Sequence, residues 1–133
     1  MSRALHLLLV AALIGIALEL LLLGHTEDLL QWIPLALAVL ALAALGWNHW
    51  SPSLASRRTT QAVMWLLILS GAAGIVLHFL GSREFQLETD PTLSGLPLVW
   101  KVIRAQSPPA LAPATMALLG ALGLIALARP ESQ

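Results

Sequence analysis

Four long runs of apolar residues, separated by polar stretches, restrict what this chain can fold into. The runs cover about residues 4–23, 29–50, 61–80 and 110–128. A helix rising 1.5 Å per residue needs about 20 apolar residues to cross a hydrocarbon core of about 30 Å, so each run is long enough for a transmembrane helix. Lipid offers no hydrogen-bond partners to an exposed backbone, and apolar segments of this length therefore fold as helices. We predict an all-α, integral membrane four-helix bundle.

The composition agrees with this class and excludes several others. Of the 133 residues, 58% are apolar and 11% are charged, whereas soluble domains average about 45–50% and 25%. The connections are too short for a separate soluble domain, so residues 1–133 are expected to form a single membrane domain. The net charge is zero, which gives no reason to expect nucleic acid as a partner. The absence of cysteine excludes disulfides, thiolate metal ligands and thiol catalysis.

The first apolar run follows Arg3 in the order that a secretory signal peptide would show. An apolar segment of about 20 residues is longer than the 7–15 residues of a signal peptide, and no small-x-small cleavage pattern follows it. We therefore expect residues 4–23 to be retained as the first span.

The long connection, residues 81–107, is expected to be a structured loop with two different parts. Residues 83–88 alternate charged or polar with less polar side chains, which favours a short strand or an extended arm. Apolar residues then recur at helical spacing at Leu96, Val99, Trp100 and Ile103. This spacing predicts a short amphipathic helix lying in the membrane interface, and an irregular loop with an apolar patch is the alternative.

The charges of the loops set the expected orientation. Basic residues favour the cytoplasmic side, most strongly in short loops, and residues 51–60 form a turn-rich connection that contains Arg57 and Arg58. With a cytoplasmic amino terminus, Arg3 and Arg129 lie on the same side, whereas the remaining cations are diluted in the long loop. We expect both termini to be cytoplasmic and residues 81–107 to be extracytoplasmic.

This topology gathers most ionisable side chains at the outer end of the bundle. The candidate binding residues there are Glu19, His25, Glu27, Asp28, His78, Glu84 and Glu88. A carboxylate inside an apolar run is costly unless it is protonated, paired or hydrated. We expect Glu19 and His78 to meet inside the upper bundle, where an acid and an imidazole would hold each other charged or share a metal. His25, Glu27 and His78 offer metal ligands, although no His-x-x-x-His or Glu-x-x-His spacing supports a metal site.

These residues also have structural explanations. Glu19 lies about one turn below the end of its span and would pair with Arg83 or accept hydrogen bonds from a helix end. Glu27 and Asp28 precede the second run, where acidic side chains stabilise the positive end of a helix.

Small residues predict how the helices pack, because they let neighbouring helices approach closely in lipid. The expected packing positions are Gly15 in the first run, Ser70, Gly71 and Gly74 in the third, and Ala117, Gly120 and Ala121 in the fourth. Glu19 shares a helical stripe with Ala11, Ala12 and Gly15. We therefore expect Glu19 to face other helices rather than lipid.

No cofactor is expected. A four-helix membrane bundle with histidines on different spans can hold a b-type haem, here through His6 and His49 or through His25 and His78. All four histidines lie at span ends, so haem is a minor alternative. No serine occurs in a Gly-x-Ser-x-Gly context and no glycine-rich phosphate loop is present, which argues against nucleophilic catalysis and leaves the question of an enzyme open, with a non-catalytic role favoured.

Several short motifs carry a resemblance to a known group of proteins. They are Gly24-His25-Thr26-Glu27-Asp28 with Gln31 and Pro34, Leu77-His78, Phe85 with Glu88, Asp90-Pro91, and the stretch from Pro109 to Pro113 with Met116. In these motifs the chain resembles small, four-span bacterial inner-membrane proteins of uncharacterised function. The resemblance implies a bacterial inner membrane and draws attention to the outer end of the bundle, but it implies no reaction.

The function expected from these features is a non-catalytic accessory or scaffold subunit of a larger membrane complex, such as a transport system. It would dock through its outer loop and small-residue faces, with other membrane subunits or a second copy as partners. The alternative is a small transporter or a metal- or proton-handling protein that uses Glu19 and His78. A pore would need polar residues at several depths, and only Glu19, Ser70 and Thr115 are available within the runs, which favours the scaffold.

Overall fold

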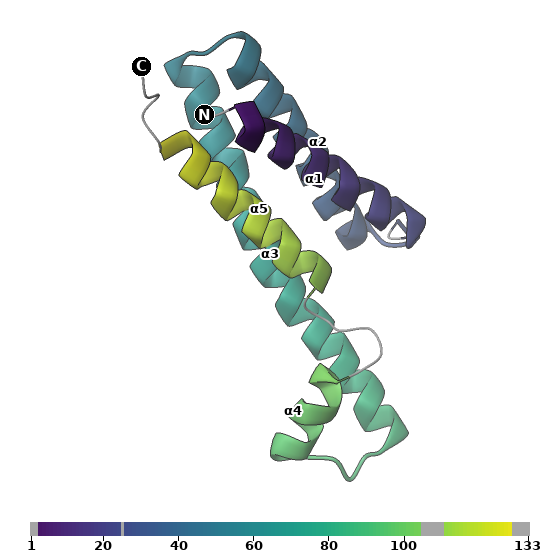
Figure 1. Ribbon diagram of the computed structural model, residues 1–133. Coiled ribbons are helices and arrows are strands. Elements are labelled where there is room, and N and C mark those ends of the chain that lie inside the picture. The colour runs from purple at the N-terminus through teal and green to yellow at the C-terminus, as the bar shows by residue number, and fades with distance from the viewer. Residues whose placement is uncertain (1–2, 25, 105–110, 129–133) are drawn as a thin grey trace.

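The computed structural model is all-helical in the residues it describes, which are 3–24, 26–104 and 111–128 (Figure 1). Five helices follow one another: α1 (Arg3–Leu22), α2 (Leu29–Trp50), α3 (Leu54–Thr89), α4 (Gly95–Ile103) and α5 (Leu111–Ala128). Helices α1, α2, α3 and α5 are long and apolar enough to cross a membrane. The predicted helical class and its four candidate spans are therefore confirmed.

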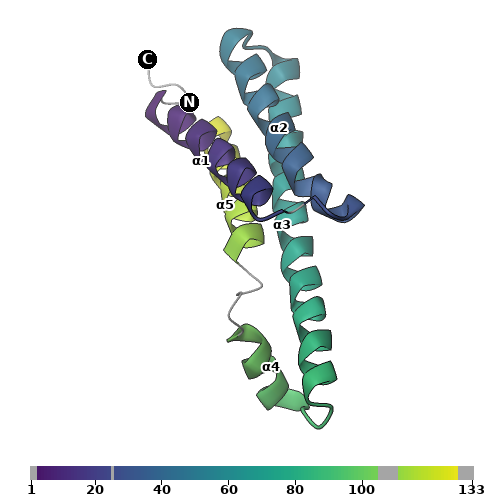
Figure 2. The same ribbon diagram turned by 90° about the vertical axis from the view of Figure 1, so that its right-hand side faces the viewer.

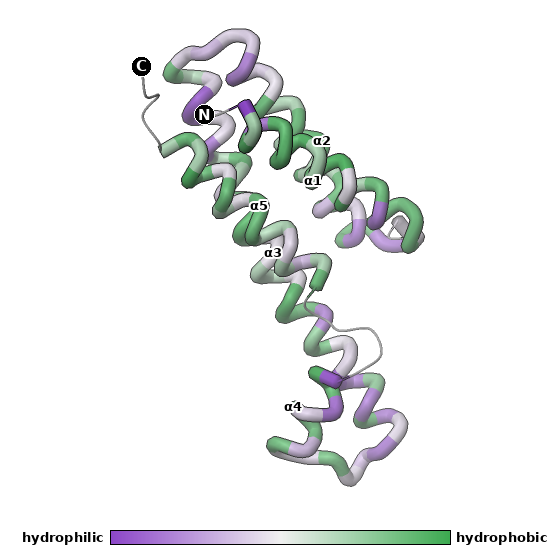
Figure 3. Tube along the Cα trace, viewed as in Figure 1, coloured by the Kyte–Doolittle hydropathy of each residue, from purple (hydrophilic) through white to green (hydrophobic). Residues whose placement is uncertain are grey.

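The outer surface of the four long helices is apolar. Leu8, Val39, Leu69 and Ile125, one from each of these helices, are all exposed. Figure 3 shows apolar residues along most of each long helix, whereas the end of α3 and α4 carry a mixture of polar and apolar residues. A continuous apolar surface of this extent is unfavourable in water and indicates contact with a lipid bilayer.

The four long helices form one bundle in which α3 makes the most extensive contacts, with α5 and then with α2. Helix α1 packs on α2 and on α5. The start of α1 and the end of α5 lie at the same end of the bundle as the connection between α2 and α3 (Figure 1). Helix α3 continues well past the opposite end of the other long helices, where α4 folds back against it (Figure 2).

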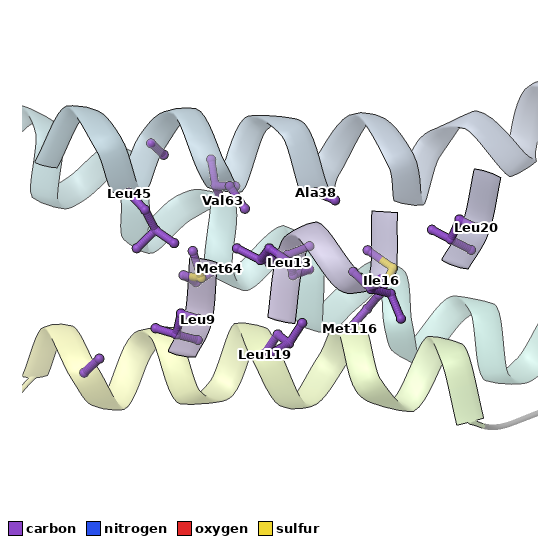
Figure 4. Close-up of a cluster of buried hydrophobic side chains, with 14 residues drawn as sticks. Leu9, Leu13, Ile16, Leu20, Ala38, Leu45, Val63, Met64, Met116 and Leu119 are labelled. Atoms are coloured by element: carbon purple, nitrogen blue, oxygen red, sulfur yellow. The ribbon is translucent and has the colours of Figure 1, made fainter. Parts of the chain in front are cut away.

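The core is formed where one stripe of α1 enters the space between α2 and α5. Leu9, Leu13 and Ile16 of α1 lie between these two helices, close to Met64 of α3 and Met116 of α5 (Figure 4). Helix α2 contributes mainly alanines to this contact, and its buried residues are Leu35, Ala38, Ala41, Ala44 and Leu45. Because alanine is small, α2 lies close to its neighbours.

Four glycines let α3 and α5 pack with their backbones nearly in contact. A Cβ atom added to Gly71 would lie 2.8 Å from the Cβ of Ala117, and one added to Gly74 would lie 2.8 Å from the Cβ of Pro113. On α5, a Cβ added to Gly120 would lie 2.8 Å from the side chain of Ile68 on α3, and one added to Gly123 would meet the side chain of Met64. We call Gly71, Gly74, Gly120 and Gly123 the glycine seam.

Most of the small residues expected to pack lie in or beside this seam. Gly71, Gly74, Ala117 and Gly120 make the contacts described above, and Ser70 and Ala121 are half-buried. Gly15 differs, because it is exposed on α1 and a Cβ added there would meet no atom within 4 Å. The buried stripe of α1 consists of Leu9, Leu13, Ile16 and Leu20 instead.

Helix α3 begins earlier than the apolar run predicts. Ser53 and Ser56 form a capping box, in which the backbone N–H of Ser56 donates to Oγ of Ser53 at 3.0 Å and the backbone N–H of Ser53 donates to Oγ of Ser56 at 2.9 Å. This pair satisfies backbone donors that a helix start otherwise leaves open. The turn-rich connection expected over residues 51–60 is therefore confined to residues 51–53, and Arg57 and Arg58 lie on the helix.

Helix α3 also ends later than predicted, at Thr89 rather than near residue 80. Residues 83–88 are helical, so the strand or extended arm predicted there is wrong. Alternation over six residues is a short pattern, and packing of α4 against this part of α3 stabilises a helix instead. Helix α4 covers the stretch where the spacing of Leu96, Val99, Trp100 and Ile103 predicts a helix.

A substitution in the seam tests its role. Gly71→Ala should lower the Tm of the purified protein in detergent, because overpacking against the α5 backbone costs about 1–3 kcal/mol. The matched variant Gly15→Ala places its methyl group in open space and should leave Tm unchanged or raise it slightly, since alanine favours a helix by about 0.5–1 kcal/mol over glycine. Equal changes in Tm for Gly71→Ala and Gly15→Ala would contradict the proposed role of the glycine seam in packing α3 against α5.

Candidate functional site

The structure separates the residues expected at the outer end into two places. Glu27 and Asp28 lie in the connection between α1 and α2, whereas Glu84 and Glu88 lie on the part of α3 that projects beyond it. Figure 1 shows the two regions well apart. His25 lies outside the described residues. The expected cluster is therefore not assembled by this fold.

Glu19 and His78 do not meet inside the bundle as expected. Both side chains are exposed, Glu19 on α1 and His78 on α3. The reason lies in α1, which buries Leu20 and Ile16 and so turns Glu19 outward. Among the described residues, no three His, Asp or Glu side chains lie close enough to hold a metal ion.

Side chains from the first turn of α2 hydrogen-bond back to the connection between α1 and α2, whereas the side chain of the N-cap residue Asp28 makes no capping hydrogen bond. Asp28 is the N-cap residue of α2, and Oε1 of Gln31 accepts a hydrogen bond of 3.0 Å from the backbone N–H of Glu27. The indole N–H of Trp32 donates to the carbonyl of Thr26 at 3.1 Å. These positions agree with the structural explanation of Glu27 and Asp28, since acids at a helix N-terminus are favourable.

At the opposite end of the same helices, two histidines lie against each other. The rings of His6 on α1 and His49 on α2 stack with their centroids 4.7 Å apart and an interplanar angle of 22°. Nδ1 of His6 is buried and has no hydrogen-bond partner. Stacked rings leave no space for a porphyrin between them, so the pair as placed does not have the geometry of two axial haem ligands.

The histidine pair lies in an open groove of about 520 Å³ between α1 and α2. We call it the histidine groove. Its lining residues are Arg3, His6, Leu7, Val10, Ile14, Leu42, Gly46, His49 and Trp50. Gly46 brings the Trp50 ring against α2, because an added Cβ there would lie 2.9 Å from Cζ3 of that ring. The surface of the groove is therefore mostly apolar, with Arg3, the two histidines and Trp50 at one end.

A second group of polar side chains joins the helices at this end. The hydroxyl of Thr60 on α3 is 3.0 Å from the carbonyl of Ala44 on α2 and 2.8 Å from that of Ser56. Oγ of Ser56 lies 3.2 Å from Oδ1 of Asn48. Nη2 of Arg57 donates to the carbonyl of Leu127 at 2.8 Å, at the C-terminus of α5. These bonds satisfy polar groups that burial would otherwise leave unpaired, which is a structural role.

The outer part of α3 and helix α4 form a projecting unit, residues 78–103, which we call the α3–α4 hairpin. Leu98 and Val102 are buried, whereas Leu96, Trp100 and Ile103 are exposed. The guanidinium of Arg104 lies 5.6 Å from the centre of the Trp100 ring, within the range of a cation–π contact. One apolar side of α4 is thus packed and another is left open.

Neither protein-family models, nor curated proteins, nor solved structures gave a match to this chain. The function must therefore be inferred from the arrangement of its own residues. Three features stand out, which are the α3–α4 hairpin, the exposed Glu19 and the histidine groove.

The turn of the hairpin should respond to acid. The side-chain hydroxyl of Thr92, at 2.6 Å, and its backbone N–H, at 3.1 Å, donate to Asp90 and lower its pKa, with a smaller contribution from Lys101. Because the folded pKa is lowered, the stabilisation is complete above the unfolded pKa of about 3.9 and is lost as pH falls through the lowered value. NMR of the Thr92 amide during acid titration should show loss of this hydrogen bond, and Asp90→Asn should abolish the transition. A Thr92 signal that does not change would contradict it.

Proposed function

We propose that the protein is a non-catalytic accessory subunit of a larger complex in a bacterial inner membrane, and that the α3–α4 hairpin docks on the partner outside the cytoplasm. The observation that carries the proposal is the projection of this hairpin beyond the other spans with an open apolar side. The bacterial membrane follows the resemblance noted from the sequence motifs.

The length of α3 supports a docking element. Its 36 residues correspond to about 54 Å of helix, whereas the hydrocarbon core of a bilayer is about 30 Å thick. Helices α1, α2 and α5, with 20, 22 and 18 residues, match one bilayer crossing. The end of α3 and α4 therefore extend past the level at which lipid would cover apolar side chains.

The open side of α4 has the composition of a binding surface. Leu96 is 84% exposed, Trp100 is 62% exposed and Ile103 is 52% exposed. Aromatic anchors surrounded by aliphatic residues dominate the binding energy of many protein interfaces. Burial of these side chains on a partner would remove their apolar surface from water, at about 25 cal/mol per Å².

Compared with the small-residue faces of the helices, the α3–α4 hairpin is the better candidate for the docking surface. The glycine seam is occupied by contacts between α3 and α5, so it is not open to a partner. Glu19 remains on the exposed side of α1 near Gly15, where a cationic side chain of a partner helix would pair with it. The transporter alternative needs Glu19 and His78 to line one path, whereas each lies on an outer surface.

Crosslinking tests the docking surface. A photo-crosslinking residue in place of Trp100 should capture a membrane protein in intact cells, and Trp100→Ser should reduce co-purification of that protein about 30-fold in mild detergent, as expected for an interface hot spot. Lys101→Ala, on the same helix, should leave co-purification unchanged. A monodisperse protein that has no partner and gives no crosslink in cells would contradict the accessory role.

Reporter fusions test the orientation. Arg3, Arg57 and Arg58 lie at the end of the bundle that holds the described chain ends, and this end is proposed to be cytoplasmic. A reporter that is active only outside the cytoplasm should be active when inserted after Thr92 and inactive when inserted after Pro52. The reverse pattern would overturn the proposed orientation.

A further inference from the structure

We infer that the histidine groove binds an anionic phospholipid of the bilayer, with the phosphate at Arg3, His6 and His49 and an acyl chain along the apolar floor. This inference concerns the opposite end of the molecule from the α3–α4 hairpin and does not rest on the accessory role.

The shape of the groove matches one lipid in one leaflet. On α1, Leu7, Val10 and Ile14 follow one another at helical spacing and form the floor together with Leu42 of α2. The eleven-residue interval from Arg3 to Ile14 corresponds to about 16 Å along a helix. This length is about half of a hydrocarbon core of about 30 Å, which is the depth that one leaflet occupies.

The polar end carries charge that an anion would complement. Arg3 is permanently cationic and presents several N–H donors suited to phosphate oxygens. The rings of His6 and His49 stack against each other and line the groove together with Arg3. None of the described residues that line the groove is acidic. Basic pockets between transmembrane helices on the cytoplasmic side are known to bind phospholipid headgroups.

Trp50 indicates that this polar end lies at headgroup level. It is 82% exposed, at the last position of α2, where an indole ring is favoured at the membrane interface. Gly46 allows its ring to lie along the helix and form one wall of the groove. A headgroup at Arg3 would therefore have its acyl chain directed toward the bilayer centre.

A lipid fits the whole groove better than a smaller anion. Inorganic phosphate would use only Arg3 and the histidines and would leave the floor of Leu7, Val10 and Ile14 uncovered. A metal ion is disfavoured because near-parallel rings direct their in-plane lone pairs alongside each other rather than toward one point.

The test uses the full-length protein in nanodiscs of phosphatidylcholine with a minority of phosphatidylglycerol. Native mass spectrometry after release from the disc should show retained phosphatidylglycerol. Loss of a membrane-surface cation changes anionic-lipid binding about fivefold, so Arg3→Gln should reduce the retained fraction by about that factor. Arg58→Gln, an exposed cation outside the groove at the same end, should not change it.

A second variant examines the floor. Val10→Phe fills the groove and should also reduce retention, whereas Val39→Phe on the exposed side of α2 should not. Circular dichroism and Tm identify variants that fold. Equal retention of phosphatidylglycerol and phosphatidylcholine would overturn the inference. So would a loss of retained phosphatidylglycerol that is as large for Arg58→Gln as for Arg3→Gln. Displacement of the lipid by inorganic phosphate alone would overturn it as well, because the floor would then contribute nothing.

Discussion

The contact between α3 and α5 through the glycine seam is the interaction on which the other parts of the structure depend. Between helices surrounded by lipid there is no hydrophobic driving force, and close van der Waals packing holds them together. The seam supplies this packing at Gly71 and Gly120, where no side chain separates the backbones. Helix α2 then joins α3 through Thr60, and α1 closes the core over α2 and α5.

The sequence was sufficient to predict those features that follow from the lengths of the apolar runs and from the positions of small residues. Four apolar runs of bilayer length predict the four candidate spans, and the glycines of the third and fourth runs lie where α3 meets α5. The sequence was insufficient to predict which face of α1 is buried, because a helix that is leucine-rich on all sides has no periodicity that distinguishes one face. Gly15 and Glu19 were predicted to face other helices, but both lie on the exposed side of α1. The ends of α3 were missed because Arg57, Arg58 and residues 83–88 are polar in sequence but helical in the structure.

The histidine groove could be predicted only in part from the sequence. His6 and His49 both lie near span ends, and the sequence places them at the same end of the bundle. Their contact depends on the register of α1 against α2, which no local pattern specifies. Leu7, Val10 and Ile14 offered the only local signal, a line of apolar residues leading away from Arg3. In a helix that is apolar throughout, such a line does not differ from its surroundings.

The continuity of α3 has a mechanical consequence. No proline interrupts α3 from Leu54 to Thr89, so one helix runs from the capping box at Ser53 to the turn at Asp90. The α3–α4 hairpin and the α3 side of the glycine seam therefore belong to the same continuous helix. Because Gly71 on this helix lies against the backbone of α5, a partner that binds the hairpin would hold a helix whose other part is locked into the core of the bundle.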